Sequence, residues 1–185
     1  MNVIVLIAAV AAVVVIFGLW YWQRKQRRAE LMGRFGPEYE RTVASADSRG
    51  AGEKDLAERE KRVSKLELKE LDGPQRQHFT EEWQGAQGRF VDGPALAIEE
   101  ADNLVQELMT ARGYPTNDFE QQAEDVSVDH PAVVSNYRAA HAIATGHAAE
   151  PASTEDLRQA MVHYRALFEE LLIPAETASA SSGGV

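Results

Sequence analysis

Five histidines and no cysteine decide which chemistry this chain of 185 residues could perform. Without cysteine, thiol nucleophiles, disulfides and cysteine-ligated zinc are impossible. Helical di-iron sites place a glutamate three residues before a histidine, and no histidine here has one. Glycine-rich phosphate loops, the G-x-S-x-G elbow and the H-E-x-x-H zinc motif are absent as well. The sequence therefore predicts no catalytic residue, no metal and no cofactor, and it favours a protein that is not an enzyme.

Three histidines in the C-terminal part are the remaining candidates for a site. His130 follows Asp129 directly, and His141 and His163 lie on or beside two long predicted helices. Together with nearby acids such as Asp125, they could ligate a metal or act as acid and base. The alternative is that a histidine on a buried helix face makes a structural hydrogen bond.

Arg138 is the basic residue whose role is least clear from its neighbours. On a helix, the residues three and four positions away are Val134, Ser135, His141 and Ala142, and none is acidic. Arg138 must therefore face water, pair across helices or bind an anion. The candidate ligand or anion site consists of Arg138, His141, His163, His130 and Asp129.

The tripeptide Tyr-Arg-Ala occurs twice, beginning at Tyr137 and at Tyr164. Aligning the two copies superimposes the apolar stripes of two predicted helices, and a short linker between them favours an antiparallel hairpin. The histidines do not correspond, because His141 follows its tyrosine by four positions and His163 precedes its tyrosine by one. The repeat is therefore interpreted as two similar packing faces rather than a duplicated site.

These candidates must be positioned by helices, and the first helix differs from all the others. Residues 3–22 carry no charge, and 20 helical residues span about 30 Å, the thickness of a bilayer core. Aromatic and then basic residues follow, as at a membrane interface: Trp20, Tyr21, Trp22, Arg24, Lys25, Arg27 and Arg28. A cleaved signal peptide would carry its positive charge before the apolar run. We expect a retained anchor with the N-terminus outside and the C-terminal domain in the cytoplasm.

Charge is divided unevenly along the chain, whose net charge is −10. Residues 22–34 hold five of the 19 basic residues and one of the 29 acidic residues. The remainder has twice as many acidic as basic residues, which excludes nucleic acid as a partner, since phosphate contacts require an excess of Lys and Arg.

No stretch shows the alternation of a β-strand, so we expect an all-α protein. Gly-Pro pairs at 36–37, 73–74 and 93–94 are predicted to end one helix and start the next. The predicted organisation is a transmembrane helix (1–23), a basic juxtamembrane segment with a flexible linker (24–52), a charged amphipathic helix (53–72), a compact soluble bundle of about five helices (73–173) and a disordered tail (174–185).

Helix starts in the bundle are predicted from capping residues. Asn117 with Glu120 has the spacing of a capping box, and so has Ser153 with Asp156. Asp129 or Ser127 is the expected cap of the helix that carries the first Tyr-Arg-Ala copy. Aromatic residues at helical spacing are assigned to the core: Phe79, Trp83, Phe90 and Phe119.

Several segments resemble an uncharacterised bacterial family of short single-span membrane proteins. They are "RFGPEYERTV", "RFVDGPALAIEEADNLVQELMTARGYP", "EDVSVDHP", "YRAAH" and "STEDLRQAMVHYRALFEELL". The resemblance covers nearly all residues from 34 to 172. It implies a bacterial single-span membrane protein, and together with the basic cluster after residue 22 it leads us to expect a location in the inner membrane. It supplies no catalytic residue, because the family carries no established activity.

Three functions remain open from the sequence. The first is a membrane-anchored interaction module, a scaffold or accessory subunit that contacts lipid through its first helix and a protein partner or a second copy through its acidic domain. The second is a metal- or small-ligand-binding bundle, or an enzyme, that uses His141, His163 and His130. The third is an extracytoplasmic envelope sensor, which requires the reverse topology.

Overall fold

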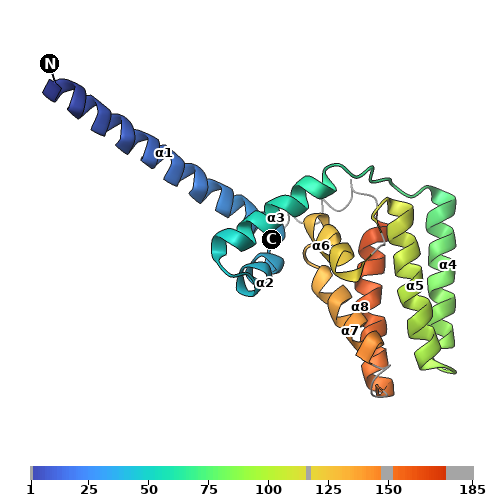
Figure 1. The fold of residues 1–185 in the computed structure, drawn as a ribbon. Coiled ribbons are helices and arrows are strands. Elements are labelled where there is room, and N and C mark those ends of the chain that lie inside the picture. Colours follow the sequence, from blue (N-terminus) through green and yellow to red (C-terminus); the bar gives the residue numbers. More distant parts are fainter. Residues whose placement is uncertain (1, 116–117, 147–151, 174–185) are drawn as a thin grey trace, which may run out of the picture. The chain divides into compact units, whose positions relative to one another are not determined.

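The computed structural model describes residues 2–115, 118–146 and 152–173, and side chains from residue 13 onward. These residues form eight α-helices and no strand, so the expectation of an all-α protein is confirmed (Figure 1). The chain divides into two units, Met1–Ala57 and Glu58–Val185, with the boundary inside one helix. The predicted tail at 174–185 lies outside the described residues.

The first unit contains α1 (Asn2–Phe35), α2 (Pro37–Ser45) and the beginning of α3 (Arg49–Val63). Gly36 joins α1 to α2 with φ +47°, a conformation that favours glycine, and Pro37 begins the next helix as predicted. The buried apolar side chains of this unit are few: Leu31, Phe35, Tyr39 and Leu56.

The part of α1 before this junction exposes its apolar side chains. Between residues 13 and 22, nine large hydrophobic side chains are each 50–65% exposed. Within the residues that the structure describes, no helix is long and apolar enough to cross a membrane. The side chains of residues 3–12, which form half of the predicted span, lie outside the described side chains.

Both predicted bounds of the charged helix, residues 53 and 72, are wrong. Ser48 Oγ accepts a hydrogen bond from the amide of Ala51 at 3.2 Å, so α3 starts at Arg49, inside the predicted flexible linker. The helix ends at Val63, and residues 67–72 are not helical. The amide of Lys69 instead donates to the carbonyl of Arg112 at 2.9 Å, which draws this segment onto the end of another helix.

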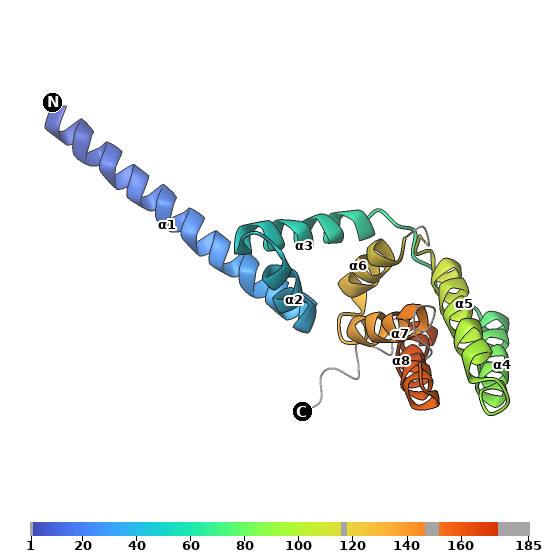
Figure 2. The same ribbon diagram turned by 60° about the horizontal axis from the view of Figure 1, so that its bottom comes forward.

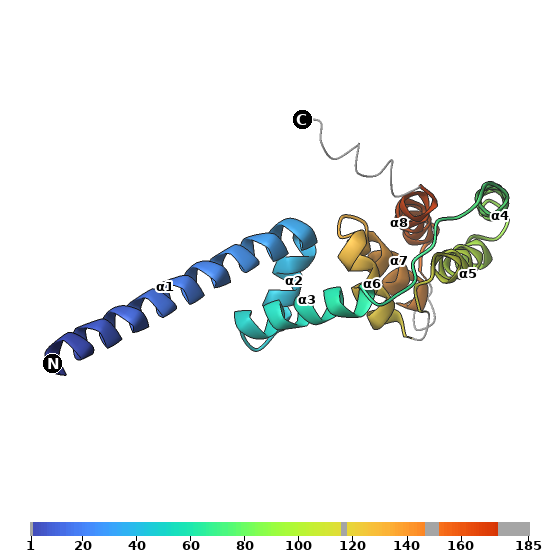
Figure 3. The same cartoon turned by 90° about the horizontal axis from the view of Figure 1, so that it is seen from above.

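The second unit is the predicted bundle, joined by the end of α3. Its five described helices are α4 (Gly73–Arg89), α5 (Pro94–Arg112), α6 (Phe119–Asp129), α7 (Val134–Gly146) and α8 (Thr154–Leu172). Two helical pairs, α4 with α5 and α7 with α8, pack together through α5 and α8 (Figures 1 and 3). The shorter α6 lies against α7 (Figure 2).

One continuous hydrophobic core fills the bundle. Each helix turns an apolar stripe inward, as the helical spacing predicted. Trp83 of α4 stacks on Phe168 of α8, with ring centroids 4.5 Å apart. Phe79 and Trp83 are buried, whereas Phe90 and Phe119 are partly buried and pack against the core. The assignment of these aromatic residues to the core is therefore confirmed.

Helix ends in the bundle follow local capping chemistry, although not always at the predicted residue. The capping box of Ser153 and Asp156 is confirmed at the start of α8. The N-cap of α6 is Asp118, whose carboxylate accepts from the amide of Gln121, and Asn117 lies outside the described residues. The predicted cap of α7 is wrong: Ser127 and Asp129 belong to α6, whose last turn packs in the core.

Glycine at position 113 is required by the geometry of this unit. Gly113 ends α5 with φ +94°, and a Cβ atom there would lie 2.6 Å from the carbonyl oxygen of Glu67. The absence of a side chain lets residues 67–69 approach the end of α5 closely. This contact explains why a non-helical segment follows α3.

Candidate functional site

The two tyrosines of the repeated tripeptide face each other in the core but bind different partners. Tyr137 and Tyr164 are fully buried, with ring centroids 6.4 Å apart. The hydroxyl of Tyr137 donates to Gln122 of α6 at 3.1 Å, and that of Tyr164 donates to Asp102 of α5 at 2.8 Å. Burial, and the charge of Asp102, raise the pKa of both hydroxyls above the usual value. The two copies thus provide two different structural contacts.

Arg138 takes one of the three predicted options, an ion pair across helices. Its Nη1 contacts Oε2 of Glu120 on α6, and only 12% of the arginine side chain is exposed. Glu120 itself is exposed. The pair ties α7 to α6 and gives the guanidinium a carboxylate without any bound anion.

His141 and His163 are held apart by separate contacts. His141 stacks on Phe119, with ring centroids 3.6 Å apart and planes 11° from parallel, and its buried Nδ1 has no hydrogen-bond partner among the described residues. The Nδ1 of His163 lies 3.1 Å from Oδ1 of Asn136, which links α8 to α7.

The third histidine, His130, ends α6 and lies at a pocket. Its backbone N–H donates to the carbonyl of Val126, and its Nδ1 is 3.1 Å from Oε1 of Glu170 on α8. Asp129 accepts a hydrogen bond from the hydroxyl of Tyr114 at 3.2 Å. Burial, followed by the charge of Asp129, raises the pKa of Tyr114 above its usual value.

The predicted site residues therefore do not converge on one centre. His130 and Asp129 line the same pocket, while Arg138, His141 and His163 each have a partner elsewhere. Within the described part of the chain, no group of three or more histidine, aspartate or glutamate side chains could hold a metal ion. A bundle that uses His130, His141 and His163 together has no geometric support in these residues.

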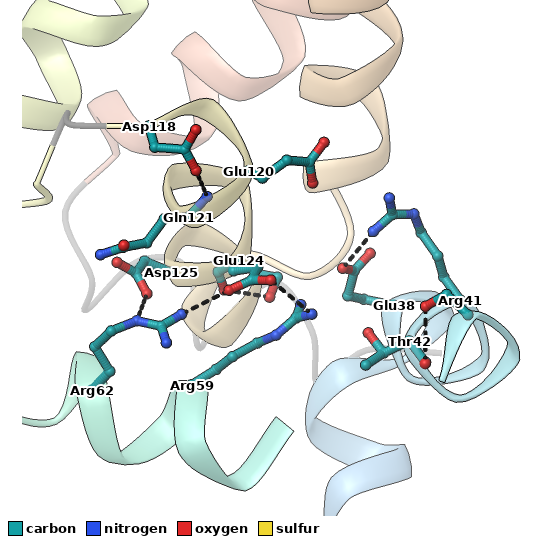
Figure 4. Close-up of polar contacts among 12 residues, drawn as sticks. Glu38, Arg41, Thr42, Arg59, Arg62, Asp118, Glu120, Gln121, Glu124 and Asp125 are labelled. Carbon is teal, nitrogen blue, oxygen red and sulfur yellow. Dashed lines mark hydrogen bonds and ion pairs between the residues drawn. The ribbon is translucent and has the colours of Figure 1, made fainter. Parts of the chain in front are cut away.

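An ion-pair network that the sequence did not predict connects the end of α3 to α6 (Figure 4). Arg62 donates from Nε to Asp125 at 2.6 Å and from Nη2 to Glu124 at 3.0 Å, and Arg59 lies 3.3 Å from Glu124. Asp125 is fully buried and Arg59 is 4% exposed. The sequence contained a signal for this network, since Arg59 falls on the stripe of Leu56 and Val63, where only a paired charge is tolerated.

The pocket beside His130 brings charged groups of both signs together. It is open, has a volume of about 440 Å³, and lies where α5, α6 and α8 end beside residues 68–70. Arg112 and Tyr114 line it although they expose only 7% and 3% of their surface. Sequence reasoning missed Arg112, since nothing local distinguishes it from the cations that commonly end a helix.

A second pocket, of about 240 Å³, belongs to the first unit and is basic. Its lining includes Tyr21 of α1 together with Arg24, Lys25, Arg28 and Arg49. Arg24 also stacks over the Trp20 ring at 5.1 Å. The acid of this pocket, Glu53, lies 3.8 Å from Arg28 and accepts a hydrogen bond from the Tyr39 hydroxyl at 2.9 Å. Part of the aromatic cluster and part of the basic cluster that the sequence placed at a membrane interface therefore meet here.

Comparison with protein families, with characterised proteins and with solved structures finds no match for this chain. The family resemblance of residues 34–172 stays a prediction.

Proposed function

We propose that this chain is a single-pass membrane protein whose acidic helical bundle serves as an interaction module. The observation that carries the proposal is the stretch of nine exposed hydrophobic side chains between residues 13 and 22. They surround the helix instead of forming a stripe, and a helix that is apolar on all sides requires an apolar environment. The uncharged residues 3–12 extend the same run to the length of a bilayer.

The basic pocket supports an interfacial position for the end of this run. Trp20, Tyr21 and Trp22 suit the headgroup level, and the cations that follow suit the cytoplasmic surface. In this proposal the N-terminus is outside, the bundle is cytoplasmic and the membrane is the bacterial inner membrane. The bundle, which lacks a convergent set of catalytic groups among its described residues, acts as a scaffold or accessory subunit that binds a protein partner or a second copy.

Membrane insertion is tested by extracting cell membranes that contain the full-length protein with alkaline carbonate. An inserted protein stays in the pellet, while a surface-bound protein is released. Fusions of a cytoplasmic and a periplasmic reporter to the C-terminus then determine topology. A signal from the periplasmic reporter alone would replace the proposed orientation with that of an envelope sensor.

The interaction role is tested by mild crosslinking in cells, followed by purification of the intact protein in detergent. We expect a defined crosslinked species that contains a membrane partner or a second copy. Recovery of monomer alone, with no partner at any crosslinker concentration, would contradict the proposal.

A further inference from the structure

Arg112 is a nearly buried cation that forms no ion pair with the described side chains. It exposes 7% of its surface, and its Nε has no hydrogen-bond partner among the described residues. No ion pair of its guanidinium is found in this part of the chain, whereas the buried Arg59 of the same unit lies 3.3 Å from Glu124. A guanidinium stays charged at every accessible pH, and an unpaired buried charge is strongly unfavourable. The guanidinium therefore has hydrogen-bond donors that the described side chains leave unused.

The surroundings of Arg112 have room for an anion. Arg112 lines the open pocket of about 440 Å³, a volume within the range of about 300–1,000 Å³ that is usual for small-ligand sites. Its planar fork of N–H donors matches a carboxylate. We propose that this pocket binds a small zwitterion, an α-amino acid with an apolar side chain, whose carboxylate pairs with Arg112.

The charge of the lining favours a zwitterion over a phosphate or another dianion. Three carboxylates line the same pocket, namely Glu70, Asp129 and Glu170, and they outnumber the two side chains that are always cationic there, Arg112 and Lys69. The carboxylates would repel a ligand with two negative charges, but they offer acceptors to an ammonium group. A ligand with one carboxylate and one ammonium satisfies Arg112 and adds no net charge.

The remaining lining accounts for the apolar part of the ligand. Leu68 and Ile173 are 38% and 41% exposed, and both line the pocket. An aliphatic side chain placed against them would remove apolar surface from water on both sides. This inference is independent of the proposed membrane anchorage, because all the lining residues belong to the second unit.

The test is calorimetric titration and thermal unfolding of the full-length protein in detergent with L-leucine as the probe. We expect leucine to bind with a millimolar or lower Kd and to raise the Tm by roughly 5–10 °C at one hundred times the Kd. Leucine amide, which lacks the carboxylate, and 4-methylpentanoate, which lacks the ammonium group, should each bind at least tenfold more weakly. If leucine at ~50 mM produces neither heat nor a shift in Tm, the proposal is wrong.

Two variants separate a ligand contact from a structural one. Arg112→Gln should abolish the response to leucine, and its Tm without leucine should equal or exceed that of the wild type, because an unpaired buried charge has been removed. The matched control is Arg165→Gln on α8, where the arginine side chain is 47% exposed, and it should keep the full response. A large fall in Tm for unliganded Arg112→Gln would show that Arg112 has a structural role and would overturn the proposal.

Discussion

The two units of this chain differ in how far their hydrophobic side chains are exposed. Between residues 13 and 22 of α1, large apolar side chains are 50–65% exposed on every face of the helix. In the bundle, the apolar residues of α5 and α8 form stripes, and most members of those stripes are buried. Large hydrophobic residues occupy nine of the ten positions from 13 to 22 and therefore cover every face of the helix, whereas those of α5 and α8 recur on one face.

The periodicity of apolar residues along a helix indicates where the packing partner of that helix lies. A stripe predicts that a helix is covered on one side by other helices of the same chain. A helix without a stripe predicts that its partner lies outside the chain, in lipid or another molecule. Four substitutions test this contrast and the contacts inside the bundle, from the largest expected effect to the smallest.

The largest effect is expected from a phenylalanine in the core. Phe168 is 2% exposed and stacks on Trp83, so Phe168→Ala should lower the free energy of unfolding of the bundle by about 3–5 kcal/mol. Phe17 is 65% exposed, and Phe17→Ala should leave that free energy unchanged. Urea titrations in detergent, followed by circular dichroism, measure the free energy of unfolding of both variants. Equal decreases for the two variants would contradict the difference in side-chain burial between the units.

A charge placed on an exposed valine of α1 tests whether residues 3–22 insert into a membrane. Val13→Arg, at the middle of residues 3–22, should disfavour membrane insertion by about 2.5–3.5 kcal/mol and shift the protein toward the soluble fraction. Val91, which is 86% exposed beside α4, is the control, and Val91→Arg should not change the fractionation. Quantitative immunoblots of membrane and soluble fractions give the ratio, and an unchanged ratio for Val13→Arg would argue against anchorage.

A glycine substitution tests the close approach at the end of α5. Gly113→Ala should destabilise the bundle by about 2 kcal/mol, because alanine disfavours a positive φ and its Cβ would meet the Glu67 carbonyl. A Cβ atom added at Gly88, near the end of α4, would have nothing within 4 Å, so Gly88→Ala should be neutral or stabilising by up to about 1 kcal/mol. Thermal unfolding should therefore show a lower Tm for Gly113→Ala alone, and an unchanged Tm for this variant would mean that the close approach is dispensable.

The smallest effect on the free energy of unfolding at neutral pH is expected for the buried tyrosines. Their effect increases as the pH rises above about 10. Burial first, and then Asp102, raise the pKa of Tyr164 above the ordinary tyrosine value of about 10. Above pH 10 the unfolded chain therefore binds fewer protons than the folded protein, and stability falls as pH rises, by up to ~1.4 kcal/mol per pH unit for each such tyrosine. Stability attributable to this group is fully present below about pH 10.

Removing the Tyr164 hydroxyl should reduce that alkaline loss. Tyr164→Phe is expected to destabilise the bundle by about 1 kcal/mol at pH 7, through the lost hydrogen bond to Asp102, and to lessen the slope above about pH 10. Urea unfolding at about pH 7, 10 and 11 measures the slope. The same slope for the variant and the wild type would mean that Tyr164 does not resist ionisation in the folded state.

Local signals predicted much of the bundle. The apolar stripes, the Ser153 capping box and the helix starts at the three Gly-Pro pairs all depend on residues a few positions apart, and all three agree with the structure. The end of α3 at Val63 could not be predicted in this way, because it depends on the backbone contact between Lys69 and Arg112.

The candidate site was harder to predict for the same reason. The sequence showed that Arg138 lacks a local partner, but not that Glu120 on another helix provides one. Conversely, Arg112 looked ordinary in the sequence because its isolation arises from burial by segments distant along the chain. Residue spacing indicates which charged side chains lack an ion-pair partner on their own helix. The tertiary structure determines whether another helix provides one.

Because Trp83 is buried against Phe168, we expect its fluorescence to differ from that of the other two tryptophans. Of the three tryptophans, Trp20 and Trp22 are exposed on α1, while Trp83 is 5% exposed in the core and its indole N–H has no hydrogen-bond partner among the described residues. An indole shielded from water emits at shorter wavelength than an exposed one. Replacing Trp20 and Trp22 with phenylalanine would leave a fluorophore that reports on the bundle alone, while the reverse variant, Trp83→Phe, would report on α1 alone.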